Sequence, residues 1–388
     1  MPIINRVAEF SEEIAVWRRH LHENPELGYE EHKTAAFVAD KLKSFGVDEI
    51  VSGIGKTGVV AVIKGRKNTS GKVVGLRADM DALPILEATD VPYKSKNPGT
   101  MHACGHDGHT AMLLGAAKYL AETRNFDGTA IMIFQPAEEG GAGGLAMCED
   151  GLIERFGIQE VYGMHNMPGI PLGEFAIRTG PAMAAADRFD IHIEGKGGHA
   201  ARPHECIDPI VASAQLIMGL QTIASRGTDP LDSIVISTCD VKSGDTYNVI
   251  PQSALLRGTV RTLKAETRLM AERRIREISA GIALATGAAI TVTYHKGYPV
   301  TVNHPDQTEF AAKVAAAISG GSKVDRSIAP LMGSEDFSYM LEARPGAYIF
   351  LGNGDTAGVH HPAYDFDDKA IPVGVSYWVK VAETAMAA

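Results

Sequence analysis

The chain contains two kinds of hydrophobic pattern, which predict two kinds of sheet. Short, continuous apolar runs occur at residues 59–63, 73–76, 130–134 and 348–351. Runs of this kind are typical of strands that are buried on both faces. A helical pattern over 32–45, which ends at Gly46, precedes these runs, and another over 110–123 lies between them. We therefore expect an α/β domain with a mostly parallel central sheet and helices on its faces.

A different pattern begins near residue 185. Residues 188–194 alternate strictly, with Phe189, Ile191 and Ile193 opposite charged or polar side chains, so one face of this strand is expected to contact water. A helix follows, with Asp208 as N-cap and Pro209 as its first residue. The remaining elements are strands near 233–238 and 254–262, a helix with an apolar stripe at Ile275, Ile278, Ile282 and Ala285, and an alternating strand at 290–295.

The order of these elements is β-α-β-β-α-β, the ferredoxin-like α+β pattern. The buried-strand pattern returns after residue 297, so we expect this domain to be inserted into the first one. The predicted bounds are 1–183 and 297–388 for the first domain and 184–296 for the insertion. A length of 388 residues also favours two domains, because single hydrophobic cores rarely grow that large.

Charge and composition narrow the class of partner. The net charge of -10, with no cluster of Lys or Arg, argues against nucleic acid and anionic membranes, so we expect a small-molecule partner. No apolar run reaches the length of a membrane span, and the first residues lack the pattern of a secretory signal, which predicts a cytoplasmic protein. Four widely spaced cysteines are expected to be free thiols, with at most one in chemical use: Cys104, Cys148, Cys206 and Cys239.

Candidate metal ligands follow the apolar runs. They are Asp79 and Asp81 after 73–76, Glu138 and Glu139 after 130–134, His165 after 161–164, the stretch 101–110 before a predicted helix, and His360 and His361 after 348–351. In open α/β sheets, ligands bind beyond the carboxyl ends of the strands. We therefore expect these five loops to converge.

The stretch MHACGHDGHT at 101–110 is the densest group of candidate ligands. Cys104 and His106 are two positions apart in a glycine-containing loop, which lets both side chains bend toward one ion. Sulfur, nitrogen and oxygen donors together suit zinc, with manganese, cobalt or nickel as alternatives if several oxygens join. His102 and His109 are interpreted as residues that support the ligands or begin the helix, and His20 and His22 as structural residues of an early helix.

Other polar motifs have two interpretations when read alone. Glu138 and Glu139 suit a division of roles, one as ligand and the other as general base, but an acidic surface turn has the same sequence. The glycine-rich turn at 195–200 contains His199, which a flexible turn also explains. Asn248 and Arg261 fit either substrate contacts or an ordinary turn and a strand surface.

Taken together, these motifs resemble a known family over nearly the whole chain. The motifs lie, in order, at 19–28, 77–84, 101–110, 135–141, 163–166, 195–204, 333–337 and 360–362. The chain resembles the metal-dependent amidohydrolases that include hippurate hydrolases, N-acyl-amino-acid deacylases and plant auxin-conjugate hydrolases, within the wider aminoacylase and carboxypeptidase superfamily. The resemblance implies a catalytic metal-binding domain and an inserted lid or dimerisation domain.

The resemblance also implies roles for individual residues. Two divalent metal ions, zinc or manganese before cobalt or nickel, would be held by Cys104, His106, Glu139, His165 and His360, with Asp81 in support. His360 is favoured over His361 because the family ligand stands two positions before the proline, although Val359 replaces the more usual leucine. Glu138 would be the general base, and His199 would reach across a homodimer or higher oligomer to stabilise the oxyanion. Asn248 and Arg261 would contact the substrate.

The function that follows is hydrolysis of the amide bond of N-acyl amino acids by a metal-activated water. Three alternatives are weighed against it. One is a metallo-carboxypeptidase or dipeptidase acting on small peptides. Another is a binding protein with a structural metal site, which predicts four ligands clustered locally, whereas the candidates here lie far apart in the sequence. The last is a cysteine nucleophile at Cys104 with His106 or His165 as base.

Overall fold

The computed structural model describes residues 3–388 and divides them into two compact units. The first unit runs to Ala182 and also contains Val302–Ala329 and Asp336–Ala388; the second comprises Met183–Thr301 and Pro330–Glu335. The second unit thus extends past the predicted 184–296 at both ends. It also includes a short segment that no hydrophobic pattern marked, because the Ala184 backbone N–H donates to the carbonyls of Leu331 (3.0 Å) and Gly333 (2.9 Å).

The first unit is built on an eight-stranded sheet with the order β1-β2-β4-β3-β5-β16-β6-β15. Its strands are β1 (Glu49–Ile54), β2 (Gly58–Lys64), β3 (Val73–Asp79), β4 (Thr129–Gln135), β5 (Glu160–Met167), β6 (Phe175–Ala176), β15 (Val324–Asp325) and β16 (Gly346–Gly352). The four central strands β4, β3, β5 and β16 are parallel, while β1 and β2 form an antiparallel edge. The mostly parallel sheet is therefore confirmed. A separate two-stranded sheet pairs β7 (Gly180–Met183) with β14 (Thr301–Asn303).

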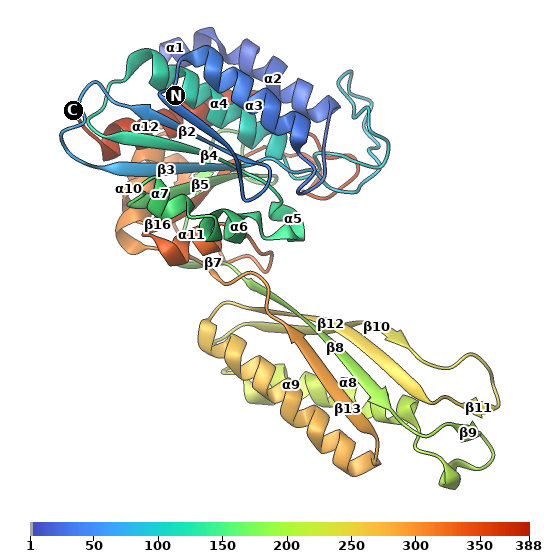
Figure 1. Ribbon diagram of the computed structural model, residues 1–388. Helices are drawn as coiled ribbons and strands as arrows, with labels where there is room; N and C mark the ends of the chain where they lie inside the picture. The colour runs from blue at the N-terminus through green and yellow to red at the C-terminus, as the bar shows by residue number, and fades with distance from the viewer. Residues whose placement is uncertain (1–2) are drawn as a thin grey trace. The chain divides into compact units, whose positions relative to one another are not determined.

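Helices cover both faces of this sheet (Figure 1). One face carries α2, α3 and α4, and the opposite face carries α6, α7 and α11. The helices of the unit are α1 (Asn5–Glu9), α2 (Ser11–Glu23), α3 (His32–Phe45), α4 (His106–Thr123), α5 (Glu138–Gly141), α6 (Gly143–Glu149), α7 (Leu152–Arg155), α10 (Pro305–Ser319), α11 (Ser338–Ala343) and α12 (Ile371–Ala385). Side chains such as Val59, Leu76 and Met132 pack against α2, α3, α4, α10 and α12 in one continuous core.

The bounds of the helices and strands correct two predictions. The helix predicted over 32–45 has these bounds, with Gly46 in the left-handed conformation (φ 71°) at its end. The helix predicted from residue 110 instead begins at His106, because Gly105 adopts φ 90° and turns the chain directly into α4. His106 is thus the first residue of a helix and lies outside the expected loop. His165 likewise lies inside β5 and not beyond its end.

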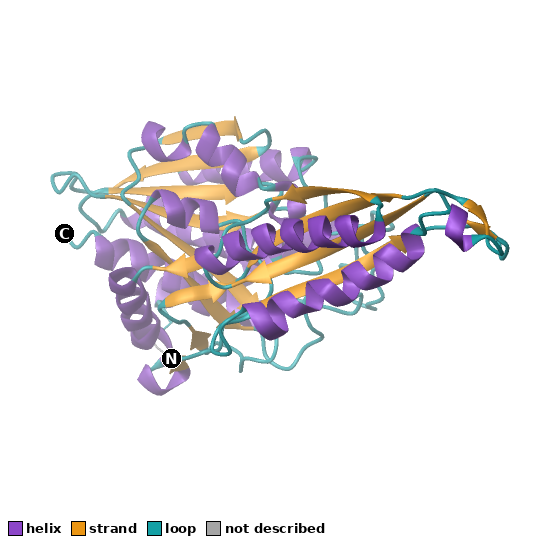
Figure 2. Ribbon diagram, turned by 90° about the horizontal axis from the view of Figure 1, so that it is seen from below, coloured by secondary structure: helices purple, strands orange, loops and turns teal. Residues whose placement is uncertain are grey.

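The second unit is a four-stranded antiparallel sheet with the order β10-β12-β8-β13. Its elements are β8 (Ala185–Glu194), α8 (Pro209–Gly227), β10 (Ile234–Lys242), β12 (Ser253–Thr262), α9 (Ala265–Thr286) and β13 (Ala289–His295), with a short pair β9 (Gly198–His199) and β11 (Val249–Ile250). Both long helices lie on one face (Figure 2), where Phe189, Ile191 and Ile193 pack against them. The β-α-β-β-α-β order and the alternation of β8 are confirmed.

Two carboxylates stabilise this unit locally. The Asp208 side chain accepts hydrogen bonds from the backbone N–H groups of Ile210 (2.8 Å) and Val211 (3.3 Å), which confirms it as the N-cap of α8. Asp187 is buried and accepts hydrogen bonds from the Arg268 guanidinium and the Tyr294 hydroxyl. Among the described residues, the helices are each too short or too polar to cross a bilayer.

Candidate metal centre

The first unit brings the predicted ligands together at the carboxyl edge of its parallel strands. Cys104 and His106 come from the entry to α4, His165 from β5, Glu139 from the segment after β4, and His360 from the segment after β16. Donor atoms lie within 4.8 Å of one another in each of three overlapping groups: Cys104, His106 and His165; Cys104, Glu139 and His360; and His106, Glu138 and Glu139. The convergence expected from sequence is therefore present in the structure.

Backbone carbonyls fix which nitrogen each imidazole presents. His106 Nδ1 donates to the Asp81 carbonyl (2.9 Å), and His165 Nδ1 donates to the Asn166 carbonyl (2.5 Å). The Nε2 atom of each ring is then an acceptor. His165 Nε2 lies 3.3 Å from the Cys104 sulfur, and His106 Nε2 is buried without a hydrogen-bond partner. Both lone pairs are thus available to a cation.

The two adjacent glutamates occupy a tightly turned segment. Ala137 (φ 48°) and Ala142 (φ 55°) both adopt the left-handed conformation around it. The Glu139 backbone N–H donates to Asp81 Oδ2 (2.8 Å), so Asp81 holds both Glu139 and the His106 ring. Glu139 Oε1 lies 3.0 Å from His360 Nε2. Glu138 is buried, which contradicts the interpretation of this dipeptide as a solvated acidic turn.

Burial and neighbouring charges shift the pKa values in this cluster in different directions. The Cys104 thiol and the Glu139 carboxylate raise the pKa of His360 to about 10. Burial alone would raise the pKa of the Asp79 carboxyl, but its neighbours His106, Arg77 and His109 bring this pKa well below its usual range. Burial raises the pKa of the Cys104 thiol, which opposes a spontaneously ionised nucleophile.

The donor set fits a divalent cation of the zinc class. It combines one thiol, three imidazoles and carboxylate oxygens, and it includes the buried His106 Nε2, which has no hydrogen-bond partner. A positive ion would satisfy this nitrogen and replace the proton that Cys104 and Glu139 hold on His360. His361 has a different contact: its Nδ1 accepts a hydrogen bond from the Ala363 backbone N–H (3.0 Å).

Two further histidines lie beside the ligands. His109 Nδ1 donates to Asp79 Oδ1 (2.6 Å) while its Nε2 accepts the Asn166 backbone N–H (2.9 Å). The Asn166 side chain in turn donates to the Cys104 carbonyl (2.6 Å). His109 therefore orients the segment that carries Cys104, as interpreted from sequence. His102 is buried, and neither of its ring nitrogens has a hydrogen-bond partner.

The predicted residues of the second unit form two separate groups. His199 in β9 pairs with Val249, and its Nδ1 accepts the Ala201 backbone N–H (3.1 Å). The Asn248 carbonyl accepts the Ala200 backbone N–H (3.0 Å), so Asn248 lies beside His199. Arg261 lies elsewhere, near the far end of β12, where it pairs with Ala186. The structure therefore brings His199 and Asn248 together but not Arg261.

Comparison with known proteins places this chain in a family. Residues 75–384 match the model of peptidase family M20/M25/M40. The chain belongs to this family.

Relatives cover nearly all of the chain. Hippurate hydrolase of Campylobacter jejuni is 45% identical, with 98% of this chain and 99% of the relative covered. N-acetyl-L-cysteine deacetylase of Bacillus subtilis is 44% identical and covers 93% of this chain and 85% of the relative. The crystal structure of the Bacillus subtilis YxeP protein, described as a dinuclear metal binding peptidase from M20 family, superposes with a TM-score of 0.85 at 37% identity, covering 98% and 99% of the two chains.

The sequence analysis did not identify a buried ionic network that lies beside the candidate ligands of this family member. Arg18 is fully buried and donates to Asp107 (2.9 Å) and Asp365 (2.5 Å). Asp107 follows the candidate ligand His106, and Asp365 follows the candidate ligand His360 in the same segment. Arg18 thereby joins the two parts of the chain that supply these ligands. The signal in the sequence is weak: Arg18 and His22 are polar residues four apart on the otherwise apolar face of α2.

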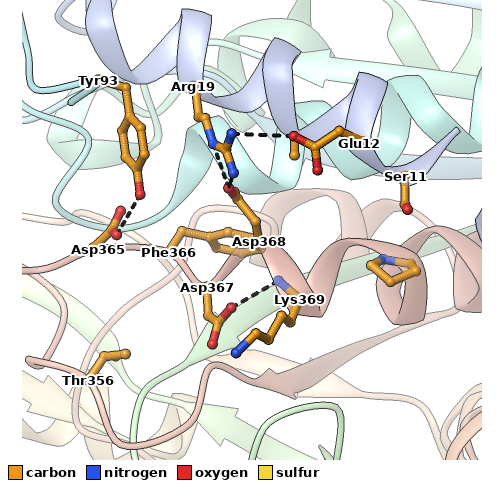
Figure 3. A pocket seen from close by; sticks show the side chains of 12 residues that line it. Ser11, Glu12, Arg19, Tyr93, Thr356, Asp365, Phe366, Asp367, Asp368 and Lys369 are labelled. Carbon is orange, nitrogen blue, oxygen red and sulfur yellow. Dashed lines mark hydrogen bonds and ion pairs between the residues drawn. The ribbon is translucent and has the colours of Figure 1, made fainter. Parts of the chain in front are cut away.

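His22 belongs to this network, in agreement with its interpretation as a structural residue. Its ring contacts Asp107 (2.8 Å) and Glu87 (3.3 Å), and these carboxylates raise its pKa to about 9 against the opposing effect of burial, the largest single influence. A cavity of about 590 Å³ lies beside the network and is lined by residues that include Arg19, Tyr93 and Asp368 (Figure 3). None of the candidate ligands lines it, so this cavity is separate from the metal centre.

A glycine between two ligands provides a test of the geometry. A Cβ atom on Gly105 would lie 2.2 Å from Asn166 Nδ2 and 2.5 Å from the Tyr364 hydroxyl, and the residue adopts φ 90°. We expect Gly105→Ala to displace Cys104 and His106 and to weaken metal affinity at least about tenfold. The purified variant should therefore contain less metal than the wild type. The matched control is Gly46→Ala, where φ is 71° but no atom lies within 4 Å of the added Cβ. Equal metal content in both variants, measured by elemental analysis, would contradict this geometry.

Proposed function

We propose that this protein hydrolyses the amide bond of N-acyl amino acids, such as hippurate or N-acetyl amino acids. The observation that carries the proposal is the placement of the Glu138 carboxylate within 4.8 Å of donor atoms of His106 and Glu139, inside the predicted ligand set. The hippurate hydrolase and the N-acetyl-L-cysteine deacetylase that it resembles support this class of substrate. The substrate would be a small molecule with a free carboxylate.

Two divalent ions would be held by Cys104, His106, Glu139, His165 and His360. Zinc and manganese are the metals proposed first, because one thiol and three imidazoles favour zinc while the carboxylate oxygens also admit manganese. When bound, such ions lower the pKa of a coordinated water towards about 7 and polarise a carbonyl oxygen. Asp81 contributes indirectly, because it holds the His106 ring and the Glu139 backbone in place.

Glu138 would perform the proton transfers. Its carboxylate accepts a proton from the attacking water and then delivers it to the amide nitrogen, so that the amine leaves neutral and the carboxylate is restored. Burial of Glu138 suits this role, since a base removed from bulk water exchanges its proton with the substrate in preference to solvent. His199 would donate a hydrogen bond to the oxyanion of the tetrahedral intermediate, and Arg261 and Asn248 would bind the substrate.

The geometry of the second unit favours delivery of His199 from a partner subunit. In the β8 and β12 pair, Arg261 lies opposite Ala186, whereas the β9 turn with His199 follows the other end of β8 at Glu194. Eight residues separate positions 186 and 194, which corresponds to roughly 26 Å at about 3.3 Å per residue. One substrate of amino-acid size does not bridge this distance. A homodimer or higher oligomer formed through the second unit, as predicted from the sequence, would supply His199 and Arg261 to one site from two chains.

The role of Glu138 can be tested by a neutral, isosteric change. Glu138→Gln removes the proton acceptor but keeps the size of the side chain and leaves the proposed ligands unaltered. We expect kcat for hippurate hydrolysis to fall by about 10²- to 10⁴-fold, the usual contribution of general acid–base catalysis, while the metal content stays near that of the wild type. Glu342→Gln, on α11, serves as the control. A Glu138→Gln enzyme that retains wild-type kcat would refute the assignment.

Complementation tests whether His199 acts on the partner subunit's site. Loss of one oxyanion donor costs about 10²- to 10³-fold in kcat, so His199→Gln and Glu138→Gln should each be nearly inactive alone. When the two variants are coexpressed, each mixed dimer contains one site with both residues intact. We expect activity of about a quarter of the wild-type value from random pairing of symmetric subunits. A mixture with no more activity than its parents, or a fully active monomer by light scattering, would exclude action in trans.

A further inference from the structure

The segment before α3 contacts the loop that carries the two glutamates. Glu31 is fully buried, and one of its carboxylate oxygens accepts the Ala137 backbone N–H at 2.8 Å. Its other oxygen accepts the Thr57 hydroxyl at 2.6 Å. Glu31 is also the N-cap residue of α3, yet its side chain makes no capping hydrogen bond to that helix. The carboxylate is therefore directed at the loop and not used to begin α3.

Ala137 is an unusual place for such a contact. It precedes Glu138 directly and adopts the left-handed conformation (φ 48°, ψ 46°), which is unfavourable for a residue with a Cβ. Such a conformation persists only when surrounding contacts hold it. Ala137 is fully buried, and a Cβ on Gly28 would lie 3.1 Å from its Cα, so the chain near residue 28 packs directly against it. The hydrogen bond from Ala137 to Glu31 is thus one of the contacts that maintain this backbone.

The other side of Glu138 is held in a similar way. The Glu139 backbone N–H donates to Asp81 Oδ2 at 2.8 Å. Two carboxylates from distant parts of the chain therefore accept the amides immediately before and after the proposed base. The Tyr29 hydroxyl adds a third contact by donating to the Gly141 carbonyl (2.7 Å). Asp81 also contacts the proposed ligand His106, whereas the Glu31 carboxylate contacts Ala137 and Thr57.

We propose that Glu31 is a positioning residue for Glu138: it fixes the backbone of Ala137 so that the Glu138 carboxylate points at the reacting water. This inference rests on the proposed role of Glu138 as base. Because Asp81 holds the ligand Glu139 independently, loss of Glu31 should misdirect the base while leaving the metal ligands in place. A displacement of about 1 Å at a reacting group can reduce turnover about 10²-fold.

The chemistry of the contacts predicts which substitutions are tolerated. In Glu31→Gln, the amide oxygen still accepts the Ala137 N–H, and the amide nitrogen donates to the Thr57 hydroxyl, whose oxygen can also accept. The Glu31→Gln enzyme should therefore retain activity. Glu31→Ala and Glu31→Met offer no acceptor, and Met has a similar length. Either leaves the Ala137 N–H without its partner and frees the left-handed residue.

The experiment compares kcat, KM and metal content of the full-length, metal-loaded enzyme with hippurate. We expect Glu31→Ala and Glu31→Met to lower kcat by about 10²-fold, with KM within about threefold and metal content unchanged, and Glu31→Gln to keep kcat within about threefold. The matched control is Glu26→Ala. Glu26 lies in the same segment and also accepts backbone N–H groups, those of Lys33 and Thr34, but these belong to α3. Its loss should leave kcat within about threefold.

A second measurement separates positioning from general stability. If Glu31 acts through Glu138, adding Glu31→Ala to Glu138→Gln should lower the residual kcat no further. Additive losses, a folded Glu31→Gln enzyme with strongly reduced kcat, or equal losses in Glu31→Ala and Glu26→Ala would each overturn the inference while the role of Glu138 stands. An active Glu138→Gln enzyme would instead overturn the proposed function, and with it the role of Glu31.

Discussion

The structure of the first unit depends on the convergence of thiol, imidazole and carboxylate donors at one edge of a parallel sheet. Their donor atoms lie within 4.8 Å of one another in overlapping groups, although they come from segments far apart in the sequence. Such a concentration of buried polar groups is unfavourable unless each group is paired. The Asp81 and Asn166 carbonyls accept from two of the imidazoles, and His106 Nε2, which has no hydrogen-bond partner, marks the place that a cation would fill.

Backbone conformation also helps to bring the candidate groups together. Left-handed residues occur where the chain turns a candidate group toward the centre: Gly105 (φ 90°) between Cys104 and His106, Ala137 (φ 48°) before Glu138, and His360 itself (φ 65°). Two of these three are not glycine, so contacts with the surrounding structure must hold them. The hydrogen bond between Glu31 and Ala137 is one such contact. Residues outside the candidate ligand set therefore help to position the backbone of the candidate groups.

Much of this arrangement could be predicted from the sequence, because burial leaves a periodic signal. Continuous apolar runs identified β2, β3, β4 and β16, and strict alternation identified β8. The start of α4 was misplaced, since the buried polar residues His106, Asp107 and His109 conceal the helical period there. The pairing of Arg18 with Asp107, 89 positions away, leaves no local pattern at all. Contacts of this kind are set by the tertiary structure, so their partners cannot be read from spacing.

The claim at the centre of this account is that hydrolysis requires divalent ions in the first unit. The most direct test is to remove metal with a chelator and to measure metal per chain and hippurate hydrolysis in the same samples. The account predicts about two ions per chain before treatment, loss of hydrolysis in step with loss of metal, and recovery when zinc or manganese is restored. Full hydrolytic activity in protein that has been shown to contain no metal would contradict it.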